Sequence, residues 1–160
     1  MNNKSVFPII FLILVLVAVS GCISNNGNNT TSVKNYTGNG ISVNYPSDWT
    51  LQNDTEGILV FLKNSGTNTQ LTIQTILQTG ISSEGMIPPI DNITVISNTT
   101  KKIDNTTAKD VTYKSNLLMY ETIYFQKNGK TFIINYQAPT NEFNNETTNF
   151  NTIINSIKVQ

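Results

Sequence analysis

Histidine and arginine are both absent from this 160-residue sequence, and the only cysteine is Cys22. Without histidine, the chain lacks the side chain that most often acts as a general base near pH 7 and as a metal ligand. A single cysteine also excludes an internal disulfide and a site built from several thiolates. The composition therefore predicts no metal site, no cofactor and no enzymatic activity.

Charged residues are scarce as well, at 12% of the chain, against roughly 25% in an average protein. If the N-terminal segment with Lys4 is removed, nine lysines remain against ten acids, a formal charge of 9 − 10 = −1. No basic patch is available for phosphate backbones, so nucleic acid is not an expected partner.

The N-terminal segment has the layout of an export signal. Lys4 precedes the uncharged run Val6–Val19, which as a helix would rise only about 21 Å, less than a ~30 Å membrane core. Small residues then lead to Cys22, and the order Val19-Ser20-Gly21-Cys22 resembles the lipobox of prokaryotic lipoproteins. That resemblance implies a signal peptide over residues 1–21 and a lipid on Cys22 that anchors the chain on the extracytoplasmic side of the cell membrane.

Two other interpretations of this segment stay open. Ser5 to Ile23 forms an uncharged stretch of about nineteen residues, near the length of an uncleaved membrane anchor. A plain secretory signal followed by an incidental cysteine is the other alternative. A double lipid chain on Cys22 would hold a protein to a membrane more firmly than a single chain does.

Residues 22–35 consist of Cys22 and a run dominated by Asn, Ser, Thr and Gly. Such a composition buries too little apolar surface to fold, so we expect a flexible linker here. The remaining residues, 36–160, are of ordinary size for one domain with its own core.

Asn-x-Ser/Thr triplets are frequent and could carry glycans on an exported surface. The candidates in the predicted domain and at its border are Asn35, Asn53, Asn92, Asn98, Asn105 and Asn145, and Asn28 and Asn29 lie in the linker. An AT-rich genome, which favours Asn and Thr codons, would also produce many such triplets by chance.

Alternation with a period of two dominates the domain and predicts β-strands. The candidate strands are Ile41–Tyr45, Trp49–Leu51, Gly57–Lys63, Leu71–Ile76, Thr94–Ile103 and Lys109–Tyr113. Two further strands flank Asn128-Gly129, a dipeptide typical of a two-residue hairpin turn.

The hairpin turn fixes a register in which Glu121 lies opposite Tyr136 and Phe125 opposite Phe132. One face then carries Met119, Ile123, Phe125, Phe132, Ile134 and Tyr136 and must face the core. The other face carries Tyr120, Thr122, Tyr124, Ile133 and Asn135, and because it is half apolar we expect a cover over it.

A helical spacing of apolar residues follows Pro139 and supplies that cover: Phe143, Thr147, Phe150, Ile154 and Ile157. Asn144 or Asn145 could cap this helix, and Glu146 would lie in its first turn. We expect the helix to end near Ser156 and a short last strand to follow.

Two segments of the domain resemble PsbP-type domains. ISVNYPSDW, residues 41–49, is similar to the first hairpin of that family, and FNTIINSIKV, residues 150–159, is similar to its closing helix and strand. The resemblance implies an α+β fold, an antiparallel sheet of about six or seven strands with packed helices in an α/β/α sandwich. It also implies a shape shared with a Ran-GTPase-binding import factor. Metal sites proposed for the family involve histidine, and none transfers to this chain.

Four residues could contact a ligand. Trp49 beside Asp48 could line a sugar or cation pocket, although a lone tryptophan more often fills the end of a β-core. Glu121 is a carboxylate on a face predicted to be apolar, opposite Tyr136. It either reaches solvent at the end of its strand, hydrogen-bonds the Tyr136 hydroxyl, or acts on a ligand or a proton.

The favoured function is a lipid-anchored, non-catalytic binding or accessory module that recognises a protein or another envelope component. A small surface hydrolase or lyase using Glu121 and nearby tyrosines is one alternative, and a structural or adhesive surface domain is another. An enzyme would need a concave pocket that contains a buried acid.

Overall fold

The computed structural model describes residues 32–55, 57–77 and 92–160, all within the unit Thr31–Gln160. The predicted signal peptide, Cys22 and the linker up to residue 31 lie outside the described residues. No helix in the described ranges is long and apolar enough to cross a membrane.

Ten strands and one α-helix make up the described part of the chain. In chain order they are β1 (Val33–Gly38), β2 (Ile41–Pro46), β3 (Trp49–Thr55), β4 (Ile58–Lys63), β5 (Gln70–Ile76), β6 (Thr94–Ile103), β7 (Thr106–Lys114), β8 (Leu118–Lys127), β9 (Lys130–Pro139), α1 (Thr147–Ser156) and β10 (Lys158–Val159). The predicted strands are thus confirmed, and the helix ends at Ser156 as expected.

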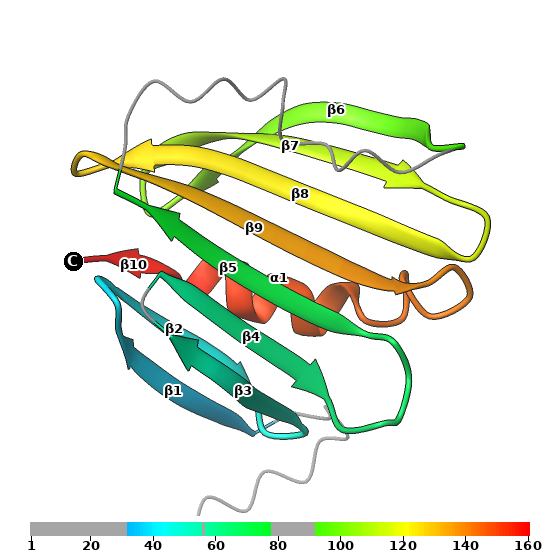
Figure 1. Ribbon diagram of the computed structural model, residues 1–160, viewed down its shortest axis with the longest axis horizontal. Helices are drawn as coiled ribbons and strands as arrows, with labels where there is room; N and C mark the ends of the chain where they lie inside the picture. Colours follow the sequence, from blue (N-terminus) through cyan, green and yellow to red (C-terminus); the bar gives the residue numbers. More distant parts are fainter. Residues whose placement is uncertain (1–31, 56, 78–91) are drawn as a thin grey trace, which may run out of the picture. The chain divides into compact units, whose positions relative to one another are not determined.

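The strands form two antiparallel sheets rather than one (Figure 1). The small sheet has the order β1-β2-β10, and the large sheet has the order β3-β4-β5-β9-β8-β7-β6. The prediction of a single sheet of six or seven strands is wrong because the turn after Pro46 separates β2 from β3, and β2 pairs with β1 and β10 instead. The prediction of several packed helices is also wrong for the described residues, in which α1 stands alone.

Strand β1 begins at Val33, inside the stretch that the sequence assigned to the linker. Its polar residues gave no apolar alternation, and its side chains are largely exposed. The strand forms because its backbone pairs with all of β2, from Val33 opposite Pro46 to Gly38 opposite Ile41.

The β8–β9 hairpin has the predicted register, with Glu121 opposite Tyr136 and Phe125 opposite Phe132. Asn128 and Gly129 both have positive φ, 50° and 74°, as a type I′ turn requires. The rings of Phe125 and Phe132 stack with their centroids 4.9 Å apart. The face predicted to be apolar is therefore the core face of the large sheet.

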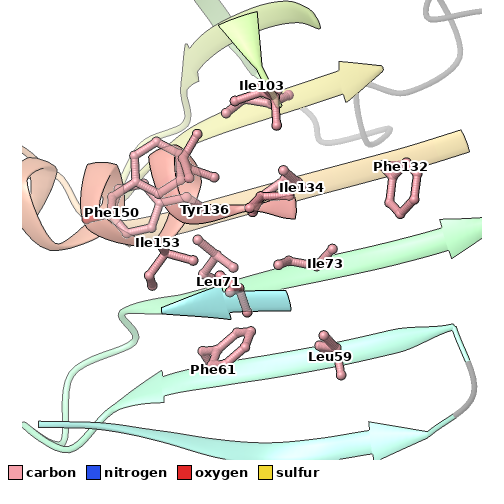
Figure 2. Packing of buried hydrophobic residues seen from close by; sticks show 14 of the residues in the cluster. Leu59, Phe61, Leu71, Ile73, Ile103, Phe132, Ile134, Tyr136, Phe150 and Ile153 are labelled. Carbon is pink, nitrogen blue, oxygen red and sulfur yellow. The ribbon is translucent and has the colours of Figure 1, made fainter. Parts of the chain in front are cut away.

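Helix α1 covers this same core face, and its predicted position on the opposite face is wrong. Phe150 stacks on Tyr136 at a centroid distance of 4.6 Å, and Ile153 belongs to the same buried cluster (Figure 2). Ile154 is a further member of that cluster. The helix also packs against β2 of the small sheet. The core thus lies between the large sheet on one side and α1 with the small sheet on the other.

The prediction of an asparagine cap on α1 is wrong. Glu146 is the N-cap residue and forms no side-chain cap hydrogen bond, while Asn144 and Asn145 are exposed. The Glu146 carboxylate instead pairs with Lys63 and accepts a hydrogen bond from Asn149 Nδ2 at 2.9 Å. The ion pair with Lys63 holds the start of the helix against β4.

Candidate functional site

Trp49 and Asp48 lie next to each other at the β2–β3 turn but in different environments. The Trp49 side chain is 0% exposed and belongs to the core cluster. No described residue accepts a hydrogen bond from its Nε1. Asp48 is exposed, so the carboxylate is at the surface and the indole is not. This arrangement corresponds to the core-filling interpretation of Trp49.

Glu121 and Tyr136 are brought together by the β8–β9 register, on strands that lie four and three positions away from β3 in the large sheet. Tyr136 is 1% exposed, and its hydroxyl donates to the Phe143 carbonyl oxygen at 3.5 Å. The Glu121 carboxylate therefore has a different partner from the tyrosine hydroxyl that the sequence suggested.

That partner is Lys101 on β6, which pairs with two carboxylates at once. Lys101 Nζ lies 2.5 Å from Glu121 Oε1 and 2.8 Å from Asp110 Oδ2, and it also lies 5.6 Å from the centroid of the Phe150 ring. The carboxylates are 12% and 11% exposed, and the Lys101 side chain is 27% exposed. We refer to Lys101, Asp110 and Glu121 as the ionic cluster.

The pKa values in the ionic cluster follow from two acids sharing one ammonium group. Burial raises the pKa of Glu121; Lys101 lowers it, and the nearby Asp110 raises it further. Burial alone would lower the pKa of Lys101, but its hydrogen bonds to Asp110 and Glu121 outweigh that effect and raise it. The arrangement favours a lysine that stays charged and a carboxyl that holds its proton to higher pH than usual.

Chemically, the ionic cluster can hold a proton and tie β6, β7 and β8 together beneath Phe150. Oδ1 of Asp110 is buried without a hydrogen-bond donor among the described residues. In the described part of the chain as a whole, no group of three acids, histidines or cysteines is placed to bind a metal ion. Lys101 and Asp110 were not predicted from the sequence, although each lies two residues from a buried apolar residue, Ile103 and Ala108 respectively.

Five of the six glycosylation candidates in the predicted domain and at its border have described side chains, and all five are exposed: Asn35, Asn92, Asn98, Asn105 and Asn145. Asn92 and Asn105 have positive φ, 60° and 63°, which asparagine tolerates in turns. For these five residues, access to the side chain is not an obstacle to modification.

A concave pocket of about 350 Å³ lies at the end of the molecule where several turns meet. Its lining residues are Asn39, Gly57, Thr75, Leu77 and Lys130. They come from the β1–β2 turn, the β3–β4 turn, the end of β5 and the start of β9. We call this the turn-end pocket. This pocket could not be predicted from the sequence, because it depends on how four separate segments meet.

Asp104, in the turn between β6 and β7, contacts the end of β8 and strand β10. Its Oδ2 lies 2.5 Å from Lys127 Nζ and accepts the Val159 backbone N–H at 2.9 Å. These hydrogen bonds lower the pKa of Asp104 to about 2. Asp54, near the β3–β4 turn, accepts hydrogen bonds from Tyr36 Oη and Asn39 Nδ2 at 2.7 and 2.8 Å.

A family model described as a PsbP-like protein matches residues 6–159 of the chain. The chain therefore belongs to the PsbP-like family, as the resemblance at both ends of the domain implied. No curated protein matches its sequence.

Solved structures show the same fold at low sequence identity. Cyanobacterial PsbP from Synechocystis is similar with a TM-score of 0.61 at 14% identity, over 86% of this chain and 98% of that one. LpqN of Mycobacterium tuberculosis, described as involved in cell envelope biogenesis, has a TM-score of 0.52 at 16% identity, over 84% and 87%. The Ran-binding protein Mog1p of Saccharomyces cerevisiae has a TM-score of 0.53 at 9% identity, over 80% and 96%.

Proposed function

We propose that this chain is a non-catalytic binding or accessory module, held by a lipid on Cys22 at the outer face of a prokaryotic cell membrane. The order Val19-Ser20-Gly21-Cys22 after a short apolar run supports the anchor. The fold supports the binding role, because Mog1p is described as Ran-binding. LpqN, described as involved in cell envelope biogenesis, supports a location in the cell envelope.

One observation favours binding over catalysis. The turn-end pocket is lined by an amide, a hydroxyl, an ammonium and an apolar side chain, whereas Glu121, the acid that an enzyme would use, lies toward the other end of β8 and pairs with Lys101. An active site of the expected kind would join the pocket and the buried acid. In the described part of the chain the two are separate, which supports recognition rather than turnover.

The anchor is tested with Cys22→Ser in the full chain, expressed in a host that processes lipoproteins, with Ser24→Ala as the control. The wild type and the control should lose residues 1–21 and partition into the detergent phase. Cys22→Ser should remain an unprocessed precursor without added lipid, as read by intact mass. A Cys22→Ser protein with the mature mass and the lipid of the wild type would refute the anchor.

Surface exposure of the sequons supports glycosylation as a further part of this proposal. Asn98→Gln and Asn105→Gln are the informative variants, because both side chains are exposed and each lies in a different sequon. If the source organism glycosylates these sites, each variant should lower the intact mass by one glycan. An unmodified wild-type mass in that organism would refute the modification.

A further inference from the structure

The turn-end pocket is lined by segments of both sheets. Those segments, the β1–β2 turn, the β3–β4 turn, the end of β5 and the start of β9, lie at the left end of Figure 1. Lys130 begins β9 on the same face as Phe132, so its side chain starts from the core face of the large sheet. Its ammonium lies over Gly40 of the β1–β2 turn, so closely that a Cβ at Gly40 would collide with it. The Lys130 side chain therefore reaches from β9 of the large sheet to the β1–β2 turn of the small sheet.

Lys130 has no acidic partner among the described residues, although other lysines at this end do. Lys127 and Lys158 both pair with Asp104, and the oxygen of Asp54 that faces the β1–β2 turn already accepts two hydrogen bonds. The half-buried Lys130 ammonium lines the pocket without a described hydrogen-bond acceptor. A cation in a concave site with no acid to neutralise it attracts an anion.

The other lining groups restrict what that anion can be. Asn39 and Thr75 offer an amide oxygen and a hydroxyl. Leu77 is 76% exposed, so its apolar side chain is open to solvent at the rim of the pocket. Gly57 has φ +82°, and a Cβ there would come within 2.9 Å of the Thr75 carbonyl oxygen, so this wall is backbone. The volume of about 350 Å³ is at the lower end of the range of small-molecule sites.

We propose that the turn-end pocket binds a small organic anion, a phosphate or carboxylate that carries a short apolar group. Lys130 contacts the anionic group, and Leu77 contacts the apolar group. This inference rests on the proposed binding role and adds the ligand class. The same chemistry occurs in a free organophosphate and in the head group of an anionic lipid, so the experiment must separate these sources.

The test uses the full lipidated chain in phosphatidylcholine nanodiscs, titrated with n-butyl phosphate and followed by the backbone amide resonances of Gly40 and Leu77. Inorganic phosphate and n-butanol are titrated separately. The expected order of affinity is butyl phosphate, then phosphate, then butanol. Lys130→Gln should weaken butyl phosphate binding roughly tenfold, as expected for loss of a charged hydrogen bond. Lys114→Gln, an exposed lysine of the same sheet, should leave it unchanged.

The apolar contact has its own matched pair of variants. Leu77→Ser should bring butyl phosphate down to the affinity of inorganic phosphate, while Leu117→Ser, whose side chain is 79% exposed in another turn, should have no effect. Equal binding by wild type and Lys130→Gln would overturn the anion site. Equal binding by wild type and Leu77→Ser would overturn the assignment of the apolar group.

The lipid source is examined in nanodiscs of phosphatidylglycerol without added ligand. Shifts of the Gly40 and Leu77 resonances that disappear in Lys130→Gln would assign the site to lipid head groups. Their absence, with butyl phosphate binding retained, would assign it to a soluble ligand. The Cys22→Ser partition experiment reads the anchor independently, so a pocket that binds neither probe overturns the ligand class and leaves the membrane location standing.

Discussion

At the scale of single residues, the ionic cluster is the feature whose protonation can be followed directly. The negative charge of Asp110 raises the pKa of Glu121. Asp110→Asn removes that charge, so Lys101 then pairs with Glu121 alone, and the pKa of Glu121 should fall. The ¹³Cδ chemical shift of Glu121 measured against pH checks this, with Asp48→Asn, an exposed acid, as the control. An unchanged or higher pKa would contradict the sharing of Lys101 by two acids.

The same shift predicts how stability depends on pH. Because the pKa of Glu121 is raised in the folded state above its usual 4.5, its stabilising contribution is present below pH 4.5 and is lost as pH rises through the folded value. Glu121→Gln does not titrate at this position, so its free energy of unfolding relative to wild type should increase with pH above 4.5. Urea unfolding at several pH values measures this difference, and a constant difference would rule out the raised pKa.

Trp49 gives a residue-scale prediction that separates a core role from a surface role. Its side chain is fully buried, so Trp49→Ala should lower the free energy of unfolding by about 3–5 kcal/mol. Trp49→Phe should cost clearly less, since it keeps a ring and removes an Nε1–H that has no described acceptor. Urea unfolding followed by far-UV circular dichroism suits both variants, since neither retains a tryptophan. A loss under about 1 kcal/mol for Trp49→Ala would contradict the core assignment.

Glu121 and Tyr136 were predictable as neighbours because a two-residue turn fixes the register on both sides of it. Lys101 and Asp110 were not. Their strands are also joined by a two-residue turn with positive φ at both positions, Asp104 and Asn105, but this dipeptide lacks the glycine of Asn128-Gly129 and is a weaker signal in the sequence. A charged residue at an inward position is also normally assigned to the surface. Only the alignment of β6, β7 and β8 shows that the three charges share one face.

At the scale of elements, the β8–β9 hairpin is the part that the sequence determines most directly. Gly129 has φ +74°, and a side chain there would meet nothing within 4 Å, so any cost of Gly129→Val comes from the backbone. We expect a loss of roughly 1–3 kcal/mol. Gly66 has φ +72° and equally open surroundings, so Gly66→Val measures the same backbone strain outside this hairpin. Denaturant midpoints measure both, and no change for Gly129→Val would place the turn elsewhere.

Helix α1 was predicted from the sequence, but the face of the large sheet that it covers was not. The apolar stripe of Phe150 and Ile154 was recognised, but a stripe does not specify which of two apolar faces it will cover. Contacts that are distant in sequence decide this: Tyr136 receives Phe150 on the core face, and Ser156 Oγ hydrogen-bonds the backbone of Asn44. Strand β1 was missed for a related reason, since it forms through backbone pairing with β2 rather than through its own side chains.

At the scale of the whole domain, the two sheets must be held together at the turn end, and Asp104 connects them there. Its carboxylate binds Lys127 of the large sheet and the backbone of Val159 in β10 of the small sheet. Lys158 adds a contact at 3.3 Å, but its side chain is 63% exposed, so that pair should contribute little. The Lys127 and Val159 contacts are therefore the ones that join the sheets.

Asp104→Asn should loosen this connection without disturbing the β8–β9 register. We expect a loss of about 1.5–3 kcal/mol at neutral pH, the usual range for hydrogen bonds to a charged group, and faster amide exchange at Val159. Since the pKa of Asp104 is lowered to about 2 from 3.8, its stabilising contribution is complete above pH 4 and is lost as pH falls through 2. Urea unfolding should thus give wild type and Asp104→Asn different midpoints at pH 7 that converge toward pH 2, while Asp48→Asn follows wild type throughout. Equal midpoints at pH 7, with unchanged exchange at Val159, would mean that the small sheet is held by its apolar contacts with α1 and not by Asp104.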